Sequence, residues 1–231
     1  MRTLVLFAAL AAIAAPATAA SRNFGITSFT RIRVDGPFKV NVATGVAPFA
    51  RASGPSQTAL DRVAIDVQGD TLVIHSNVSS WTAFPGQDAG PVEVSVGTHD
   101  LTNAWLNGAG SLVIDRVKGL NFALSVQGSG GAEIGAVDAD QVNVGVVGSA
   151  SAKLAGAARK LTAVVRGIAT LDGARLAAHD ATIGAEGAAT IDANVSDSVT
   201  IDSSGSATIR LAGRPSCTVK ATGSPSISGC R

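Results

Sequence analysis

The sequence is poor in the residues that build thick cores and highly charged surfaces. It has no tyrosine, its one methionine is the first residue, and aromatic residues make up 4% of the chain. Charged residues account for 15%, against about 25% in an average soluble domain. Gly, Ala, Ser, Thr and Val dominate instead. This composition favours short strands and tight turns around a thin core of small side chains.

The net charge is also close to zero, at +1 for the full chain. The chain has 18 basic and 17 acidic residues, and loss of Arg2 with the N-terminal segment would leave 17 of each. A nucleic-acid-binding protein normally carries a basic face. No cluster of Lys and Arg is visible here, so we expect no nucleic-acid partner.

Cysteine is rare and confined to one end. Cys217 and Cys230 are the only two cysteines, and a redox site would usually place such a pair two residues apart. In an oxidising compartment a pair this close in sequence is expected to form a disulfide. The bond would clamp the last turn of the chain and contribute about 3 kcal/mol in the chain-entropy model.

The first 20 residues are typical of a secretory signal peptide. Arg2 supplies the positive charge, residues 4–15 form an uncharged apolar run, and Ala17 and Ala19 stand where a signal peptidase reads small residues. No second run of about 18 apolar residues follows. The sequence therefore predicts an exported protein, periplasmic or extracellular on the cell surface, with no transmembrane span after cleavage.

Residues 21–100 are expected to form a β-rich portion packed on the C-terminal part of the chain. Apolar residues alternate with polar ones, as in Ile32 and Val34 or Val92, Val94 and Val96, which is the pattern of half-buried strands. Residues 77–91 form the longest irregular stretch, and a loop of that length is often functional. This loop carries Trp81 and Phe84.

Residues 101–231 repeat with a period of 18 to 20 residues, best seen by aligning one glycine per repeat. These glycines are Gly108, Gly128, Gly148, Gly167, Gly187, Gly205 and Gly223. Apolar residues recur two, four and six positions before the glycine and four positions after it. Three positions after it, the residue is small and usually hydroxylated.

The repeat predicts an all-β fold: a right-handed parallel β-helix (a β-solenoid) with coils of about 20 residues. Each repeat holds two short strands joined at the glycine, and stacked repeats share one continuous core. Right-handedness follows from the strong preference of parallel crossovers. A leucine-rich repeat would need a leucine scaffold, and a helical repeat would need a 3.6-residue period; neither is present.

Three pieces of the chain resemble the head GIN domain family, whose members are described as adhesins similar to autotransporter passenger domains. They are residues 29–40, residues 69–74 and the glycine-serine repeats, best seen at residues 128–130. The resemblance covers nearly the whole chain after the signal peptide. It implies a right-handed β-helix with a β-rich N-terminal portion and brings no catalytic residues. No C-terminal segment resembles a membrane translocator.

Catalytic and metal-binding patterns are scarce, and we predict no cofactor and no metal site. The three histidines, His75, His99 and His179, are not paired at a metal-ligand spacing, and no nucleophile elbow surrounds any serine. One alternative stays open. Asp172 and Asp192 stand at equivalent repeat positions, so they are candidates for a carboxylate pair on one outer face, as in polysaccharide-cleaving β-helices. A solvated charge ladder is the competing interpretation.

Aromatic side chains give the better indication of binding, because their faces stack on sugar rings. The candidates are Trp81, Phe84 and Trp105, although the first two could instead cap the end of the solenoid. The sequence favours a non-enzymatic, adhesin-like module that contacts a glycan or an envelope protein. The alternatives are a polysaccharide lyase or hydrolase and a self-assembling structural protein, and the oligomeric state stays open.

Overall fold

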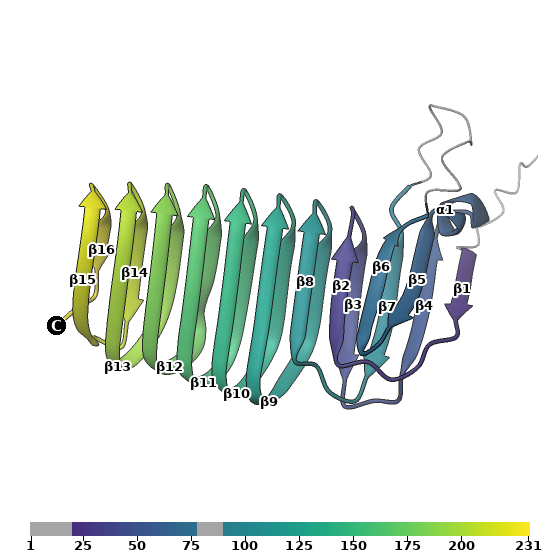
Figure 1. The fold of residues 1–231 in the computed structure, drawn as a ribbon, viewed down its shortest axis with the longest axis horizontal. Coiled ribbons are helices and arrows are strands. Elements are labelled where there is room, and N and C mark those ends of the chain that lie inside the picture. Colours follow the sequence, from purple (N-terminus) through teal and green to yellow (C-terminus); the bar gives the residue numbers. More distant parts are fainter. Residues whose placement is uncertain (1–19, 78–89) are drawn as a thin grey trace, which may run out of the picture.

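The computed structural model describes residues 20–77 and 90–231 as a β-solenoid. Figure 1 shows its strands side by side along the long axis, from β1 near one end to β15 and β16 at the other. The predicted all-β solenoid with coils of about 20 residues is confirmed, with about six turns. The proposed signal peptide and the Trp81 loop lie outside the described residues.

The N-terminal portion contains seven strands and one short helix. They are β1 (Ala20–Phe24), β2 (Arg31–Asp35), β3 (Lys39–Thr44), β4 (Phe49–Gly54), α1 (Gln57–Asp61), β5 (Val63–Gln68), β6 (Thr71–Ser76) and β7 (Glu93–Thr98). Antiparallel pairs are confined to this end, where β1 and β7 flank β4 and β5 pairs β6.

The remaining strands form the coils. They are β8 (Asn103–Gly108), β9 (Ser111–Gly128), β10 (Gly131–Gly148), β11 (Ser151–Gly167), β12 (Thr170–Gly187), β13 (Thr190–Gly205), β14 (Thr208–Ala212), β15 (Ser216–Gly223) and β16 (Ser226–Ser228). All pairings among these strands are parallel.

The strands make two opposite faces, because each of β9 to β13 passes through a bend. We call one the β2 face: β5, β6, β2, β8, the C-terminal parts of β9 to β13, and β15. The other is the β3 face: β1, β4, β7, β3, the N-terminal parts of β9 to β13, β14 and β16. Both faces run from the N-terminal portion into the coils without a break in pairing.

The core lies between the two faces and is built from the predicted apolar columns. One column holds Leu106, Val126, Val146, Val165 and Ala185, each fully buried. Ser203 continues it at 1% exposure, and among the described residues its hydroxyl has no hydrogen-bond partner. The other side chains of each strand point outward, so the surface of each face consists of straight columns of side chains spaced by one strand.

A glycine turn joins the two faces in every coil. In this turn the residue after the glycine donates its N–H to the glycine carbonyl of the preceding coil, as from Ser149 to Gly128 at 2.8 Å. Gly148 has a φ of 97°, and a Cβ there would lie 2.6 Å from the Gly128 oxygen. Glycine is thus required both by conformation and by the close approach of two backbones.

The two ends of the solenoid core are covered to different extents. At the N-terminal end, α1 buries Ala59 and Leu60 in the core. This helix was not predicted from the sequence. At the other end the inward-facing Val219 of β15 is 44% exposed, and the predicted disulfide between Cys217 and Cys230 is present. Among the described residues no helical segment has the length and hydropathy of a bilayer span.

We predict that Gly148→Ala lowers the free energy of unfolding by about 1–3 kcal/mol, because it forces a strained backbone against the carbonyl of Gly128. The matched control is Gly145→Ala. Gly145 has no positive φ, and a Cβ there would lie 4.0 Å from its nearest neighbour. The control should be neutral or stabilising by up to about 1 kcal/mol. Urea unfolding followed by circular dichroism compares them, and equal losses would contradict the steric role of the turn glycine.

We predict that the double variant Cys217→Ser/Cys230→Ser loses stability locally, in β15 and β16. The bond closes a loop with a sequence separation of 13, which corresponds to about 3 kcal/mol in the chain-entropy model. Hydrogen exchange read by mass spectrometry should show faster exchange in these two strands and unchanged exchange in β9 and β10. Unchanged protection throughout the chain would show that the disulfide does not hold the last coil.

Candidate functional site

Of the three aromatic candidates, Trp105 is the one that the structure describes; Trp81 and Phe84 lie outside the described residues. Trp105 is at the middle of β8 and points outward on the β2 face, where its side chain is partly exposed. Its neighbours in register are Arg33 of β2 and Ser125 of β9. Part of the indole is therefore exposed to solvent on this face.

A groove of about 860 Å³ lies over this part of the β2 face. The side chains that matter for its chemistry come from four strands, and they are Arg33, Asp35, Val73, Trp105, Asn107 and Gln127. Trp105 and Val73 supply apolar surface, while the other four supply hydrogen-bond donors and acceptors. The groove is thus lined by polar groups at least as much as by apolar surface.

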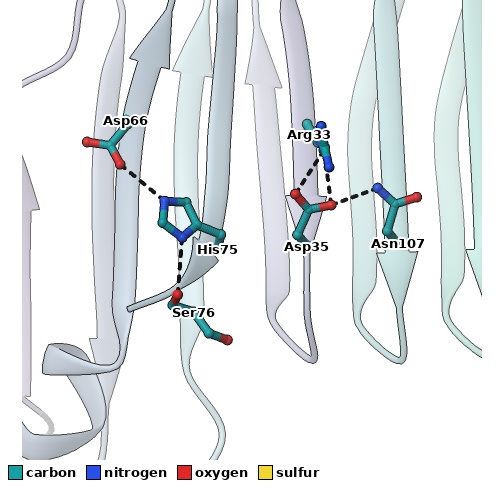
Figure 2. A network of polar contacts seen from close by, with 6 residues as sticks. All are labelled: Arg33, Asp35, Asp66, His75, Ser76 and Asn107. Atoms are coloured by element: carbon teal, nitrogen blue, oxygen red, sulfur yellow. Dashed lines mark hydrogen bonds and ion pairs between the residues drawn. The ribbon is translucent and has the colours of Figure 1, made fainter. Parts of the chain in front are cut away.

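Asp35 organises the polar side of the groove, as Figure 2 shows. Its carboxylate accepts a hydrogen bond from Asn107 Nδ2 at 2.7 Å and forms an ion pair with Arg33 Nε, which lies 2.8 Å from Oδ2. Both partners are therefore held in place. The side-chain oxygen Oδ1 of Asn107 points away from Asp35. No described residue accepts a hydrogen bond from the Nη groups of Arg33. These atoms remain available to a ligand.

A second polar pair stands on the same face: His75 of β6 is the register neighbour of Asp35, and Asp66 comes from β5, one strand further. His75 Nε2 lies 3.3 Å from Asp66 Oδ2, and His75 Nδ1 lies 3.1 Å from the backbone oxygen of Ser76 (Figure 2). A catalytic triad needs a serine hydroxyl on the imidazole, and here the contact is a carbonyl. Among the described residues no group of three metal-ligating side chains is present.

Asp172 and Asp192 lie next to each other in register on the β3 face, away from the groove. Arg210 forms a bidentate ion pair with Asp192. Its Nε lies 2.6 Å from Oδ1 of Asp192, and its Nη2 lies 3.2 Å from Oδ2. The hydrogen bonds to Asp192 and the charge of its carboxylate raise the pKa of Arg210 above its ordinary value.

From Glu133 to Arg210, this column contains charges of both signs. Lys153 stands beside Asp172 in register, and Arg175 lies 3.9 Å from Glu133. Arg210 thus engages both oxygens of Asp192, as an ion pair in such a ladder does. The geometry therefore favours a charge ladder, and the catalytic pair stays a hypothesis.

Sequence reasoning identified Trp105 but not the residues that surround it. Arg33 and Asp35 precede it by about 70 residues and reach it through the pairing of β2 with β8. The sequence did show that Arg33 and Asp35 point outward, because they alternate with apolar residues along one strand. Which other strand they would stand beside could not be read from the alternation.

Comparison with known proteins identifies relatives of most of the chain. A family model described as "Putative auto-transporter adhesin, head GIN domain" matches residues 28–215. A comparison with curated proteins gives no match.

Solved structures share the fold. A "putative adhesin" from Bacteroides fragilis NCTC 9343 superposes with a TM-score of 0.80 at 16% identity, covering 91% of this chain and 96% of that one. A "putative lipid binding protein" from Parabacteroides distasonis ATCC 8503 gives 0.70 at 18% identity, with 92% and 96% covered. A "putative adhesin" from Parabacteroides merdae ATCC 43184 gives 0.69 at 16%, also with 92% and 96% covered. Because the family model spans most of the sequence, this chain belongs to the head GIN domain family of auto-transporter adhesin-like proteins.

Proposed function

We propose that this protein is an exported, non-enzymatic binding module of the cell envelope, and that the groove around Trp105 holds a glycan. The observation that carries the proposal is the outward indole of Trp105 beside an amide, Asn107, that Asp35 holds in one orientation. Sugars present apolar C–H faces and hydroxyl pairs, so an aromatic face with a fixed planar amide suits them. Family membership as an adhesin-like protein agrees with a binding role.

Two further observations support a location in the periplasm or outside the cell. A disulfide between Cys217 and Cys230 persists in an oxidising compartment such as the periplasm or the cell exterior. An adhesin-like protein would meet its ligand there. The N-terminal signal peptide expected from the sequence would take the chain across the inner membrane.

The groove favours a neutral ligand over an acidic one. Its cation, Arg33, is paired with Asp35 on the same strand, and Asp66 adds a further negative charge two strands away. An acidic polysaccharide would gain little Coulomb attraction from such a balanced site. An envelope protein is the competing partner, and the binding experiment separates the two.

We expect Trp105→Ala to abolish glycan binding without unfolding the protein. Isothermal titration of the mature chain with soluble neutral oligosaccharides should give a dissociation constant that weakens at least tenfold in the variant. The circular dichroism melting curve should shift little, since the indole is outside the core. Val113→Ala, an outward residue on the β3 face, is the matched control and should bind like the native chain.

A second result would contradict the proposal. If oligosaccharides do not bind and an envelope protein is retained instead, the glycan assignment is wrong. If binding occurs but is unaffected by Trp105→Ala, the ligand lies elsewhere on the molecule.

We also predict that the protein does not cleave the glycans that it binds. Incubation with neutral and acidic polysaccharides should produce no new reducing ends and no absorbance from unsaturated products. Cleavage that disappears in Asp172→Asn or Asp192→Asn would make the protein an enzyme and overturn this assignment.

A further inference from the structure

The last coil of the solenoid ends in two unpaired strand edges. β15 pairs only with β13 and β16 only with β14, so the opposite edge of each strand has no neighbour among the described residues. Figure 1 shows both strands at the C-terminal end with no further strand beside them. The turn is repeated here as well: Ser224 donates its N–H to Gly205, and no further coil donates to the carbonyl of Gly223. Such an edge is a template for the addition of another strand.

The core is also open at this end. The inward-facing Val219 is 44% exposed, and Ile227 of β16 is partly exposed. The N-terminal end is covered by α1, which buries Leu60 completely and is linked to β1 by an ion pair between Asp61 and Arg22 at 2.6 Å. Apolar core surface and free backbone groups therefore occur together at the C-terminal end.

The two edges lack most of the protection that keeps exposed strands apart. Solvent-facing edges commonly carry several charges, prolines or a bulge. Within β15 and β16, Lys220 is the one charged residue, and it stands beside Asp202 of β13 in register. The disulfide between Cys217 and Cys230 links β15 to the segment that follows β16. The edge of this coil is thus nearly uncharged and is held in a closed ring.

A single two-fold axis matches both edges to those of a second copy. Val219 stands four residues before the turn glycine Gly223 and Ile227 four residues after it, so the two lie at about the same height in the coil. A two-fold axis at this height, perpendicular to both faces, makes β15 antiparallel to β15 of the second copy. It does the same for β16. Both exposed inward residues then meet their own counterparts, and the two cores become continuous.

The charges are compatible with this register. In an antiparallel ladder centred on Val219, Lys220 faces Thr218 of the second copy, so the two lysines do not oppose each other. A two-fold axis along the strands would instead pair β15, of eight residues, with the three-residue β16. Pairing each strand with its own equivalent leaves less of β15 unpaired, and we therefore prefer it.

We propose that the C-terminal edge is the interface of a tail-to-tail dimer, in which β15 and β16 each pair antiparallel with the same strand of a second copy. An interface of this kind uses the same surface on both copies, so assembly stops at the dimer. The proposal does not depend on the ligand of the Trp105 groove.

The dimer would place two Trp105 grooves on one side, because the two-fold axis is perpendicular to the β2 face. Six strand spacings separate β8 from β15, so the two indoles would lie about 60 Å apart. A surface that displays many copies of a ligand could then be bound through both grooves, which slows dissociation without any new contact.

The test is sedimentation equilibrium of the mature chain with its disulfide intact and no ligand present. The native chain should form a dimer that dissociates to a monomer on dilution. Thr218→Lys places a positive charge opposite Lys220 of the second copy and should raise the dimer dissociation constant at least tenfold. Thr218→Glu places a negative charge there and should lower this constant. A merely structural role of Thr218 would not make the effect depend on the sign of the charge.

Thr182→Lys is the matched control, because Thr182 is an exposed residue of the same outward column, two strands inside the edge. It should leave the dissociation constant unchanged, and circular dichroism should show that all three variants are folded. Small-angle X-ray scattering of the native dimer needs no variant. It should give a maximum dimension close to twice the length of one solenoid.

Several results would overturn the interface. They are a chain that stays monomeric at its highest soluble concentration, a compact side-by-side dimer, and a dimer on which both Thr218 variants have the same effect. Growth beyond the dimer would show that the free edge pairs with the N-terminal end of another copy, and would also overturn it.

A separate measurement tests the paired grooves. On a surface coated with a neutral glycan, the native chain should dissociate at least tenfold more slowly than Thr218→Lys, while both bind soluble oligosaccharides equally. Equal dissociation rates would contradict the bivalent arrangement. If the dimer forms but no glycan binds, the interface stands and the proposed function fails.

Discussion

The stacking of one glycine turn on the next is the constraint on which the rest of the structure depends. In this turn the residue after the glycine donates its backbone N–H to the glycine carbonyl of the preceding coil. The hydrogen bond from Ser206 to Gly187 has a length of 2.9 Å. A Cβ on Gly205 would lie 2.7 Å from that same carbonyl. The turn therefore fixes the spacing of the coils, and with it the straight columns of side chains on both faces.

Straight columns explain how a chain with few aromatic and charged residues can still form a binding surface. The core consists mainly of Val, Ala, Leu and Ile in register and contains few aromatic residues, among them Phe29, Phe38 and Phe122. The outward positions are then free to vary from coil to coil without disturbing the interior. On the β2 face they combine Trp105, the amide of Asn107 and the ion pair of Arg33 with Asp35. On the β3 face they form the charge ladder that includes Asp192 and Arg210.

The repeat made the architecture predictable, because each coil follows the same local rules. The seven aligned glycines and the columns of apolar residues indicated both the coil length and the inward positions, and the structure confirms them. Cys217 and Cys230 could be paired because no other cysteine exists. Helix α1 was missed because five residues are too few to show a helical period, although Ser56 caps it by accepting from the Ala59 N–H at 3.1 Å. The surroundings of Trp105 were missed because they depend on the non-local pairing of β2 with β8.

The central claim is that the β2 face is the binding surface, and chemical-shift mapping tests it most directly. Isotope-labelled mature protein would be titrated with a soluble neutral oligosaccharide, with Trp105→Phe used to assign the indole signal. The account predicts shifts in the Trp105 indole N–H and in the side-chain amides of Asn107 and Gln127, with the β3 face unchanged. Shifts confined to the β3 face around Asp172 and Asp192 would contradict it.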